Sequence, residues 1–231
     1  MLTVAVVLAG GTGERFGTPM PKQLLPVGGR PMIEHSVAAF EQAPDVGSIL
    51  VVMTAGHAAH VADLLTAGGY RKVTGVIDGG KTRVESTRRA LAALGDTDCD
   101  VLLHDAARPL VDQATIAGCI AALATHRAVG VAVPSSDTIA LVSDGVMTGI
   151  PPRASLARCQ TPQGFRLAVI RQAHDLAAAD PDFATLPATD DCGIVLRYLP
   201  EVGVHVVPGT ERNLKITYPT DLAVAEMLLR K

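Results

Sequence analysis

The sequence predicts an α/β fold with a doubly wound, mostly parallel sheet and a protruding β-hairpin arm. Two observations predict the sheet. Short apolar runs rich in valine and isoleucine recur along the 231 residues and are continuous rather than alternating, as in strands buried on both faces. Stretches with helical spacing lie between these runs, and such alternation is typical of doubly wound folds. A third observation, a hairpin signal in the second half of the chain, predicts the arm.

The expected strands and helices alternate along most of the chain. Strands are expected at Val4–Leu8, Ile49–Met53, Val73–Ile77, Val101–His104, Val129–Val133 and Val204–Val207. Helices are expected at Met32–Phe40, His57–Ala67, Arg83–Leu94, Ala114–Thr125, Leu167–Ala179 and Leu222–Leu229. In such a Rossmann-like arrangement ligands lie beyond the carboxyl ends of the strands, so the segments that follow strands are the first candidates for a site.

The segment after the first strand is suited to binding a polyphosphate. Before Gln23 it carries, in chain order, Ala9, Gly10, Gly11, Gly13, Arg15, Gly17 and Lys22. Glycines let backbone N–H groups approach anionic oxygens, and cations offset the negative charge. The spacing is not that of a P-loop, and Phe16 occupies the third glycine position of the dinucleotide fingerprint. A loop of this length is usually functional; the alternative is a surface loop with two solvated cations.

Three later segments place polar residues at the same edge of the predicted sheet. Asp105 ends a strand, where an aspartate can bind Mg²⁺ together with substrate phosphates or can cap a turn. The preceding His104 is expected to be a buried, hydrogen-bonded histidine rather than a metal ligand. Gly79 and Gly80 follow another strand, where their backbone groups could read the edge of a base or could form an ordinary strand–helix turn. Lys215 follows the last strand, either directed into the cleft or solvated.

Residues 134–161 interrupt the alternation and predict the arm. Asp144-Gly145 separates two strand-like runs, Thr138–Val142 and Val146–Ile150, which is a strong hairpin signal. A two-stranded hairpin is marginal by itself in water, so its apolar residues must pack on another surface. We expect them to dock on a second copy of the chain and form a homodimer; the alternative is packing on their own domain.

Composition limits the class of protein. With 231 residues, 48% of them hydrophobic, the chain is expected to form a single domain over 1–231. A net charge of −3 does not favour a nucleic-acid surface. The four cysteines form no C-x-x-C pair, which argues against a zinc site and for a reducing, cytoplasmic environment. The start of the chain is expected to be a strand rather than a signal peptide, and no apolar run approaches the length of a membrane span.

Taken in order, the motifs resemble those of the 2-C-methyl-D-erythritol 4-phosphate cytidylyltransferase family of the non-mevalonate isoprenoid pathway. The resemblance covers most of the chain. Its parts are Ala9-Gly10-Gly11-Thr12-Gly13-Glu14-Arg15, Pro21-Lys22-Gln23, Gly79-Gly80-x-x-Arg83-x-x-Ser86, His104-Asp105-Ala106-Ala107-Arg108-Pro109, Asp137-Thr138, Arg153, Thr161-Pro162-Gln163, Thr189-Asp190 and Asn213-Leu214-Lys215-Ile216-Thr217. It implies a nucleotidyltransferase fold and transfer of CMP from CTP to 2-C-methyl-D-erythritol 4-phosphate, with release of pyrophosphate.

The resemblance also implies roles for individual positions. Arg15, Lys22 and Lys215 are similar to the family's catalytic cations, and Asp105 to the ligand of its Mg²⁺ cofactor. The implied substrate-binding positions are Ala9, Gly10, Gly11, Gly13, Gly80, Lys81, Ser86, Ala106, Arg108, Thr138, Arg153, Thr161 and Thr189.

These substrate-binding positions divide between the two substrates. The turn at Gly80, Lys81 and Ser86 would read cytosine, partly through its backbone, and Ala106 would touch the ribose. Thr138 and Arg153 would reach the acceptor from the arm of a partner subunit, with Arg108, Thr161 and Thr189 near that substrate. For Thr161 and Thr189 the alternative is helix capping. Lys81 stands where relatives often carry an acidic residue, and Gly10 where they often carry alanine, an exchange that should be tolerated.

Three alternatives compete with this interpretation. A cytidylyltransferase for ribitol 5-phosphate or another polyol phosphate would share the glycine segment and Asp105, and would differ around Arg153. A catalytically silent nucleotide-binding domain is disfavoured because silent relatives tend to lose the cations that are present here. An NAD(P)-dependent oxidoreductase is disfavoured by the missing third glycine and the late first helix.

Overall fold

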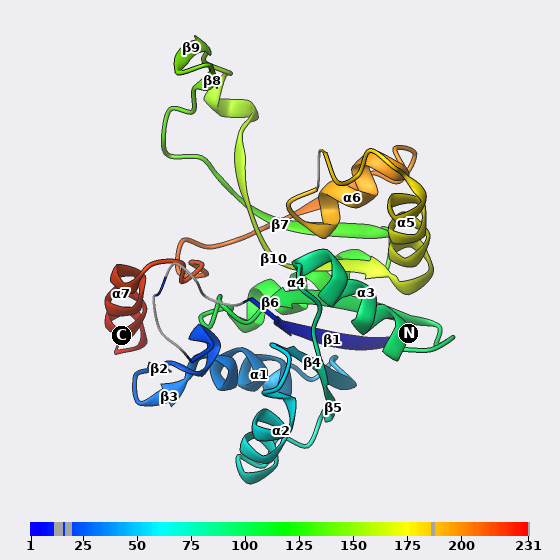
Figure 1. Cartoon of the computed structure of the whole chain (residues 1–231), viewed down its shortest axis with the longest axis vertical. Helices are drawn as coiled ribbons and strands as arrows, with labels where there is room; N and C mark the ends of the chain where they lie inside the picture. The colour runs from blue at the N-terminus through cyan, green and yellow to red at the C-terminus, as the bar shows by residue number, and fades with distance from the viewer. Residues whose placement is uncertain (12–15, 17–19, 186–187, 231) are drawn as a thin grey trace.

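A seven-stranded sheet forms the centre of the computed structural model, which describes residues 1–11, 16, 20–185 and 188–230 (Figure 1). The strand order is β11-β7-β10-β6-β1-β4-β5. Parallel pairs join β6 (Cys99–Asp105), β1 (Leu2–Ala9), β4 (Ser48–Met53) and β5 (Val73–Asp78) in that order, and also join β7 (Ala128–Pro134) to β11 (Val204–Pro208). β10 (Ala157–Arg166) runs antiparallel between β6 and β7. The predicted mostly parallel sheet is confirmed.

Helices cover both faces of this sheet. One core contains Val4, Val6 and Leu8 of β1 with residues of α3 (Arg83–Ala93), α5 (Leu167–Ala179) and α6 (Asp191–Tyr198). The other contains the alternate residues of β1 with residues of α1 (Met32–Gln42), α2 (Ala58–Ala67) and α4 (Gln113–Leu123). A third, smaller cluster joins α7 (Pro219–Leu229) to the short strand β2 (Pro26–Val27), which pairs with β3 (Arg30–Pro31). The fold is therefore doubly wound, as predicted.

Two elements that position the site differ from the sequence prediction. β10 was not expected, because Pro162 argues against a central strand; the structure accommodates it at a register shift between Gln160 and Gln163. Thr161, expected near a helix start, therefore lies inside this strand. The short helix α6 was also not expected, and its N-cap is Asp190, whose side chain accepts a hydrogen bond from the N–H of Gly193. Thr189 precedes this cap rather than forming it.

The hairpin projects from the sheet on a long arm (Figure 1). Its strands are β8 (Leu141–Ser143) and β9 (Val146–Gly149). Asp144 and Gly145 between them have φ values of +51° and +77°, which are the left-handed conformations of a tight hairpin turn. At the base of the arm Pro134 pairs with Ala157, so the last residues of the expected 134–161 excursion belong to β10 of the main sheet.

Candidate active site

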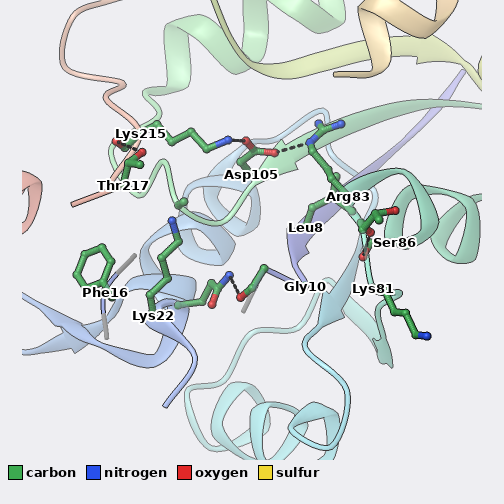
Figure 2. A pocket seen from close by; sticks show the side chains of 14 residues that line it. Leu8, Gly10, Phe16, Lys22, Lys81, Arg83, Ser86, Asp105, Lys215 and Thr217 are labelled. Atoms are coloured by element: carbon green, nitrogen blue, oxygen red, sulfur yellow. Dashed lines mark hydrogen bonds and ion pairs between the residues drawn. The ribbon is translucent and has the colours of Figure 1, made fainter. Parts of the chain in front are cut away.

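A cavity of about 360 Å³ opens beyond the carboxyl ends of β1 and β6. Predicted site residues from segments far apart in the sequence line it: Gly10, Gly11, Lys22, Lys81, Ser86, Asp105 and Lys215. Figure 2 shows Lys22 and Lys215 at one side of this cavity and Ser86 and Lys81 at the other, with the ammonium of Lys81 directed away from the other cations. The cavity thus combines a glycine backbone with cationic side chains, a combination suited to a polyphosphate.

A second cavity, of about 190 Å³, adjoins the first. Arg83, Asp105 and Lys215 line both cavities. The other residues of the second cavity are Arg108, Cys159, Gln160, Thr161, Gln163, Thr189 and Asp190. Two adjoining cavities with shared charged walls can hold two substrates with their reacting groups close together.

Asp105, the last residue of β6, lies between two cations. Its Oδ1 accepts a hydrogen bond from Nε of Arg83 at 3.0 Å, and its Oδ2 accepts one from Nζ of Lys215 at 2.7 Å (Figure 2). Burial by itself would raise the pKa of Asp105, but Arg83 and Lys215 hold that pKa well below its usual range. The carboxylate is therefore ionised. The Lys215 side chain is 45% exposed against 23% for Arg83, so Lys215 is the partner more accessible to a ligand.

Lys22 enters the first cavity from the 3-10 helix η2 (Lys22–Leu24). Its Nζ donates a hydrogen bond to the carbonyl oxygen of Ile216 at 2.8 Å. The N–H of Ile216 in turn donates to the carbonyl oxygen of Ala107 at 2.8 Å, which fixes this segment against the end of β6. The segment that carries Lys215 thus also orients Lys22.

The turn after β5 is shaped by side chains of α3. Ser86 is 2% exposed. Its hydroxyl accepts the N–H of Gly80 at 3.1 Å and donates to the carbonyl oxygen of Thr82 at 2.9 Å. The N–H of Lys81 donates to Oε2 of Glu85 at 2.7 Å. These bonds give the turn a defined backbone shape at the wall of the first cavity.

His104 is fully buried beneath Asp105. Its Nε2 lies 3.1 Å from the carbonyl oxygen of Arg108 and its Nδ1 lies 3.0 Å from Oγ1 of Thr161. Because a carbonyl only accepts, Nε2 carries the proton and the Thr161 hydroxyl donates to Nδ1. The same hydroxyl accepts the N–H of Asp105 at 3.1 Å. Burial lowers the pKa of His104 to about 4, so the expected buried, hydrogen-bonded histidine is confirmed.

Comparison with known proteins identifies the family. Residues 3–231 match the model of the family described as 2-C-methyl-D-erythritol 4-phosphate cytidylyltransferase. The chain belongs to this family. It is therefore a nucleotidyltransferase, as the motifs predicted.

Individual relatives extend this result. The chain is 52% identical over 233 residues to the 2-C-methyl-D-erythritol 4-phosphate cytidylyltransferase of Thermobifida fusca (strain YX), covering 98% of this chain and 92% of that protein. The crystal structure of 4-diphosphocytidyl-2C-methyl-D-erythritol synthase from Anaerococcus prevotii DSM 20548 is similar with a TM-score of 0.86 and 26% identity, covering 100% of this chain and 96% of that one. A bifunctional ribulose 5-phosphate reductase/CDP-ribitol pyrophosphorylase of Haemophilus influenzae is 36% identical over 231 residues, covering 98% of this chain and 48% of that protein.

Several predicted site residues of this cytidylyltransferase lie away from both cavities. Ala9 and Ala106 are fully buried, and the backbone of Ala106 serves the fold by bonding to Leu8 and Ser36. Thr138 and Arg153 are exposed on the arm. Gly13 and Arg15 lie outside the described residues.

The donor set at Asp105 fits a Mg²⁺ ion that is held mainly by substrate phosphates. Within the described part of the chain no group of three or more His, Cys, Asp or Glu side chains could hold a metal by itself. Mg²⁺ commonly binds through one or two carboxylates together with phosphate oxygens and water. Asp105 supplies one ionised carboxylate at the junction of the two cavities.

Sequence reasoning gave no role to two residues that organise the site. Arg83 lies within a quoted motif, but its partners Asp105 and Asp191 lie far away along the chain. Asn213 is fully buried. Its side-chain Nδ2 donates to the backbone carbonyl oxygen of Thr161 at 2.8 Å, and its backbone carbonyl oxygen accepts a hydrogen bond from Nη1 of Arg108 at 2.8 Å. The motif positions could be read from the sequence, whereas the pairing of these residues across the fold could not.

Proposed function

We propose that this chain transfers CMP from CTP to 2-C-methyl-D-erythritol 4-phosphate and releases pyrophosphate, in the synthesis of isoprenoid precursors. The observation that carries the proposal is the junction of the two cavities at Arg83, Asp105 and Lys215. The larger cavity, which also holds Lys22 and the glycine backbone, would receive CTP. The smaller one, with Arg108, would receive the phosphorylated polyol.

The chemistry explains why cations dominate the site. A phosphomonoester oxygen of the acceptor attacks the α-phosphorus of CTP, and the bond to the pyrophosphate oxygen breaks. The nucleophile is already ionised near neutral pH, so no general base is needed. Two like unit charges about 4 Å apart repel by about 4 kcal/mol at an effective dielectric constant near 20. Lys22 and Lys215 offset this repulsion and the charge that develops on the leaving group, and we assign the same role to Arg15.

Lys215 would act by exchanging partners. In the described structure its ammonium is bound to Asp105 on the wall shared by both cavities. A phosphate oxygen carries comparable or greater charge, so the 45% exposed side chain can turn to it at little cost. Asp105 would then be free to hold Mg²⁺, which when bound supplies further neutralisation of the triphosphate.

The binding roles of the turn and of the second cavity follow from their placement. Gly80, Lys81 and Ser86 would recognise cytosine mainly through the backbone, because the Lys81 side chain is directed away in Figure 2. Gly10 and Gly11 would bind phosphate through their backbone. Arg108, Thr161 and Thr189 would surround the acceptor.

We further propose that the arm completes the site of a second subunit in a homodimer. The hairpin exposes apolar side chains that a soluble domain would otherwise bury: Val142 at 64%, Val146 at 64% and Met147 at 61%. A partner surface covering them would carry the exposed Thr138 and Arg153 with it. Under this proposal the single domain 1–231 is the folding unit and the dimer is the functional unit.

The cysteines support a reducing compartment, which we propose is the cytoplasm. All four are free thiols, and Cys99, Cys119 and Cys192 are buried. Secreted proteins commonly pair their cysteines in disulfide bonds, whereas cytosolic proteins keep them reduced. In the described part of the chain no helix is long and apolar enough to cross a membrane.

The alternative acceptor is ribitol 5-phosphate, and the observation that favours it is the similarity to the bifunctional Haemophilus influenzae protein. A pyrophosphate-release assay with CTP and Mg²⁺ separates the two. We expect the highest kcat/KM with 2-C-methyl-D-erythritol 4-phosphate, little release with ribitol 5-phosphate, and none without an acceptor. Faster release with ribitol 5-phosphate would support the alternative, and the absence of release with every polyol phosphate would support a silent nucleotide-binding domain.

A further inference from the structure

Arg83 joins the shared wall of the two cavities to the interior of the protein. It is the first residue of α3, and its guanidinium lies between two carboxylates. Nε donates to Oδ1 of Asp105 at 3.0 Å, and Nη1 donates to Oδ2 of Asp191 at 2.6 Å. Burial opposes the charge of Arg83, but the two carboxylates raise its pKa above its usual value. The cation is therefore permanent and has two fixed anionic partners.

Asp191 is buried more completely than Asp105, at 0% against 8% exposed. It is fully buried at the start of α6, and its Oδ1 lies 3.1 Å from Nε2 of His174 on α5. Its backbone N–H donates to Oε1 of Gln163 at 3.1 Å. Burial would raise the pKa of Asp191, but Arg83 and His174 lower it, so the carboxylate stays charged. Removing a buried charge from its partner is costly, and this cost keeps Arg83 in place.

The geometry points to a positioning role for this chain of contacts. We propose that Arg83, held by Asp191 and His174, orients the Asp105 carboxylate so that Oδ2 faces the junction of the two cavities. Arg83 occupies Oδ1, which leaves Oδ2 as the oxygen that Lys215 contacts. When Lys215 turns to a phosphate, Arg83 remains as the group that fixes Asp105. Asp191 and His174 touch neither cavity, so they act through Arg83. The inference rests on the role of Asp105 in the proposed function.

The substitution Asp191→Asn tests this role, and Asp100→Asn is its matched control. Asp100 lies at the opposite end of β6, is 5% exposed, and pairs with Nη1 of Arg166 at 2.9 Å. Each substitution therefore removes the charge of one buried carboxylate paired with arginine. We expect both variants to lower the midpoint of thermal unfolding by several degrees. Only Asp191→Asn should lower kcat, by about 10- to 100-fold, because small misplacements of a reacting group have effects of that size.

A direct measurement of CTP binding separates positioning from loss of structure. We expect the dissociation constant of Asp191→Asn for CTP, measured by calorimetry, to stay within about threefold of the parent value while kcat falls. Arg83→Lys, which keeps the charge but cannot bridge two carboxylates, should show the same split. Equal losses of kcat in Asp100→Asn and Asp191→Asn would overturn the proposal, as would an unchanged kcat in Asp191→Asn.

A double-mutant cycle distinguishes failure of this inference from failure of the proposed function. If Asp191 acts through Asp105, then the variant Asp105→Asn with Asp191→Asn should be no slower than Asp105→Asn alone. Multiplicative losses of kcat would show that Asp191 acts by another route, and would overturn only the positioning role. Turnover of Asp105→Asn at the parent rate would remove Asp105 from the mechanism and overturn the positioning role alone, whereas absence of turnover in the parent chain would overturn the proposed function.

Discussion

The ammonium of Lys22 donates a hydrogen bond to the carbonyl oxygen of Ile216 at 2.8 Å, although 194 residues separate them. Ile216 adjoins Lys215, whose ammonium is bound to Asp105 at 2.7 Å. Two cations from opposite ends of the chain are thus set by one short segment. This segment is fixed in turn by α7, because the carboxylate of Asp221 accepts the N–H groups of Thr217 and Tyr218 at 2.7 and 2.8 Å. The C-terminal helix therefore contributes to the geometry of the phosphate site.

Replacement of Lys22 by alanine should affect turnover far more than stability. Loss of one preorganised cation at the transferred phosphoryl group is expected to lower kcat by about 100-fold or more. The lost hydrogen bond to Ile216 is worth about 1 kcal/mol, which corresponds to about 2–4 °C in the unfolding midpoint for a chain of this size. Pyrophosphate release and thermal unfolding of the same preparation check both values. A Lys22→Ala variant with near-parental kcat would exclude Lys22 from the mechanism.

The sequence predicted the frame of the site because the frame is set by local patterns. Continuous apolar runs predicted β1, β4, β5, β6, β7 and β11, and the carboxyl-end rule placed Asp105 and the glycine segment at one edge. The turn at Asp144-Gly145 was likewise readable, since few residue pairs adopt left-handed conformations in succession.

The remaining features depend on contacts that local patterns do not carry. Pro162 made β10 look unlike a strand, and only its neighbours β6 and β7 define it as one. Asp191 follows two other polar residues, and the local pattern gave no indication of its partner. Its pairing with Arg83 spans 108 residues, and the hydrogen bond between Lys22 and Ile216 spans more. Such pairs follow from the packing of α3, α6 and the C-terminal segment around the sheet.

The buried His104 should make stability fall on mild acidification. Its pKa is about 4 in the folded protein, against an ordinary value of 6.5, because burial disfavours the imidazolium. Between these two pH values the unfolded state binds a proton that the folded state does not. The contribution of this group to the free energy of unfolding should therefore be constant well above pH 6.5, fall as the pH drops toward 4, and decrease by about 3 kcal/mol in total. Urea unfolding at pH 7 and pH 5 measures the effect.

A His104→Gln variant is the control for this titration. Glutamine does not titrate, so its free energy of unfolding should change less between pH 7 and pH 5 than that of the parent chain. Asp105 and Asp191 affect the free energy of unfolding at lower pH than His104 does. Their pKa values are depressed in the folded protein, so the stability that they contribute is lost only as the pH falls below about 4. Equal pH dependence in the parent and in His104→Gln would assign the acid sensitivity to other groups.

Replacement of Gly10 by alanine should be destabilising, in contrast to the tolerance expected from the family pattern. A Cβ atom at Gly10 would lie 2.7 Å from Oγ of Ser86, which is buried and bonded to Gly80 and Thr82. The hydroxyl must move or lose these partners. Crowding of this kind costs about 1–3 kcal/mol. Thermal unfolding of Gly10→Ala should therefore show a lowered midpoint.

Two further variants test whether the contact with Ser86 causes the lowered unfolding midpoint of Gly10→Ala. At Gly11 the nearest atom to an added Cβ is the side-chain nitrogen of Gln23 at 3.4 Å, so Gly11→Ala should unfold near the parental midpoint. Removing the hydroxyl in Gly10→Ala with Ser86→Ala should recover part of the lost stability. A Gly10→Ala midpoint equal to that of the parent would mean that Ser86 rotates away freely.

The proposed exchange of arms between subunits can be tested with two impaired variants, assayed at a polyol phosphate concentration below the raised KM. Lys22→Ala impairs the cavity of its own subunit, whereas Arg153→Ala should impair the site of its partner by raising KM for the polyol phosphate more than for CTP. In a mixed dimer one site then carries both lesions and the other carries neither. When the two variants are unfolded and refolded together in equal amounts, half of the dimers are mixed and half of the sites in those dimers are intact, so about one quarter of the parental activity should return.

Each variant refolded alone is the control. Activity no greater than the mean of the two controls would place Arg153 in its own subunit's site, and equal effects of Arg153→Ala on both substrates would contradict its assignment to the acceptor.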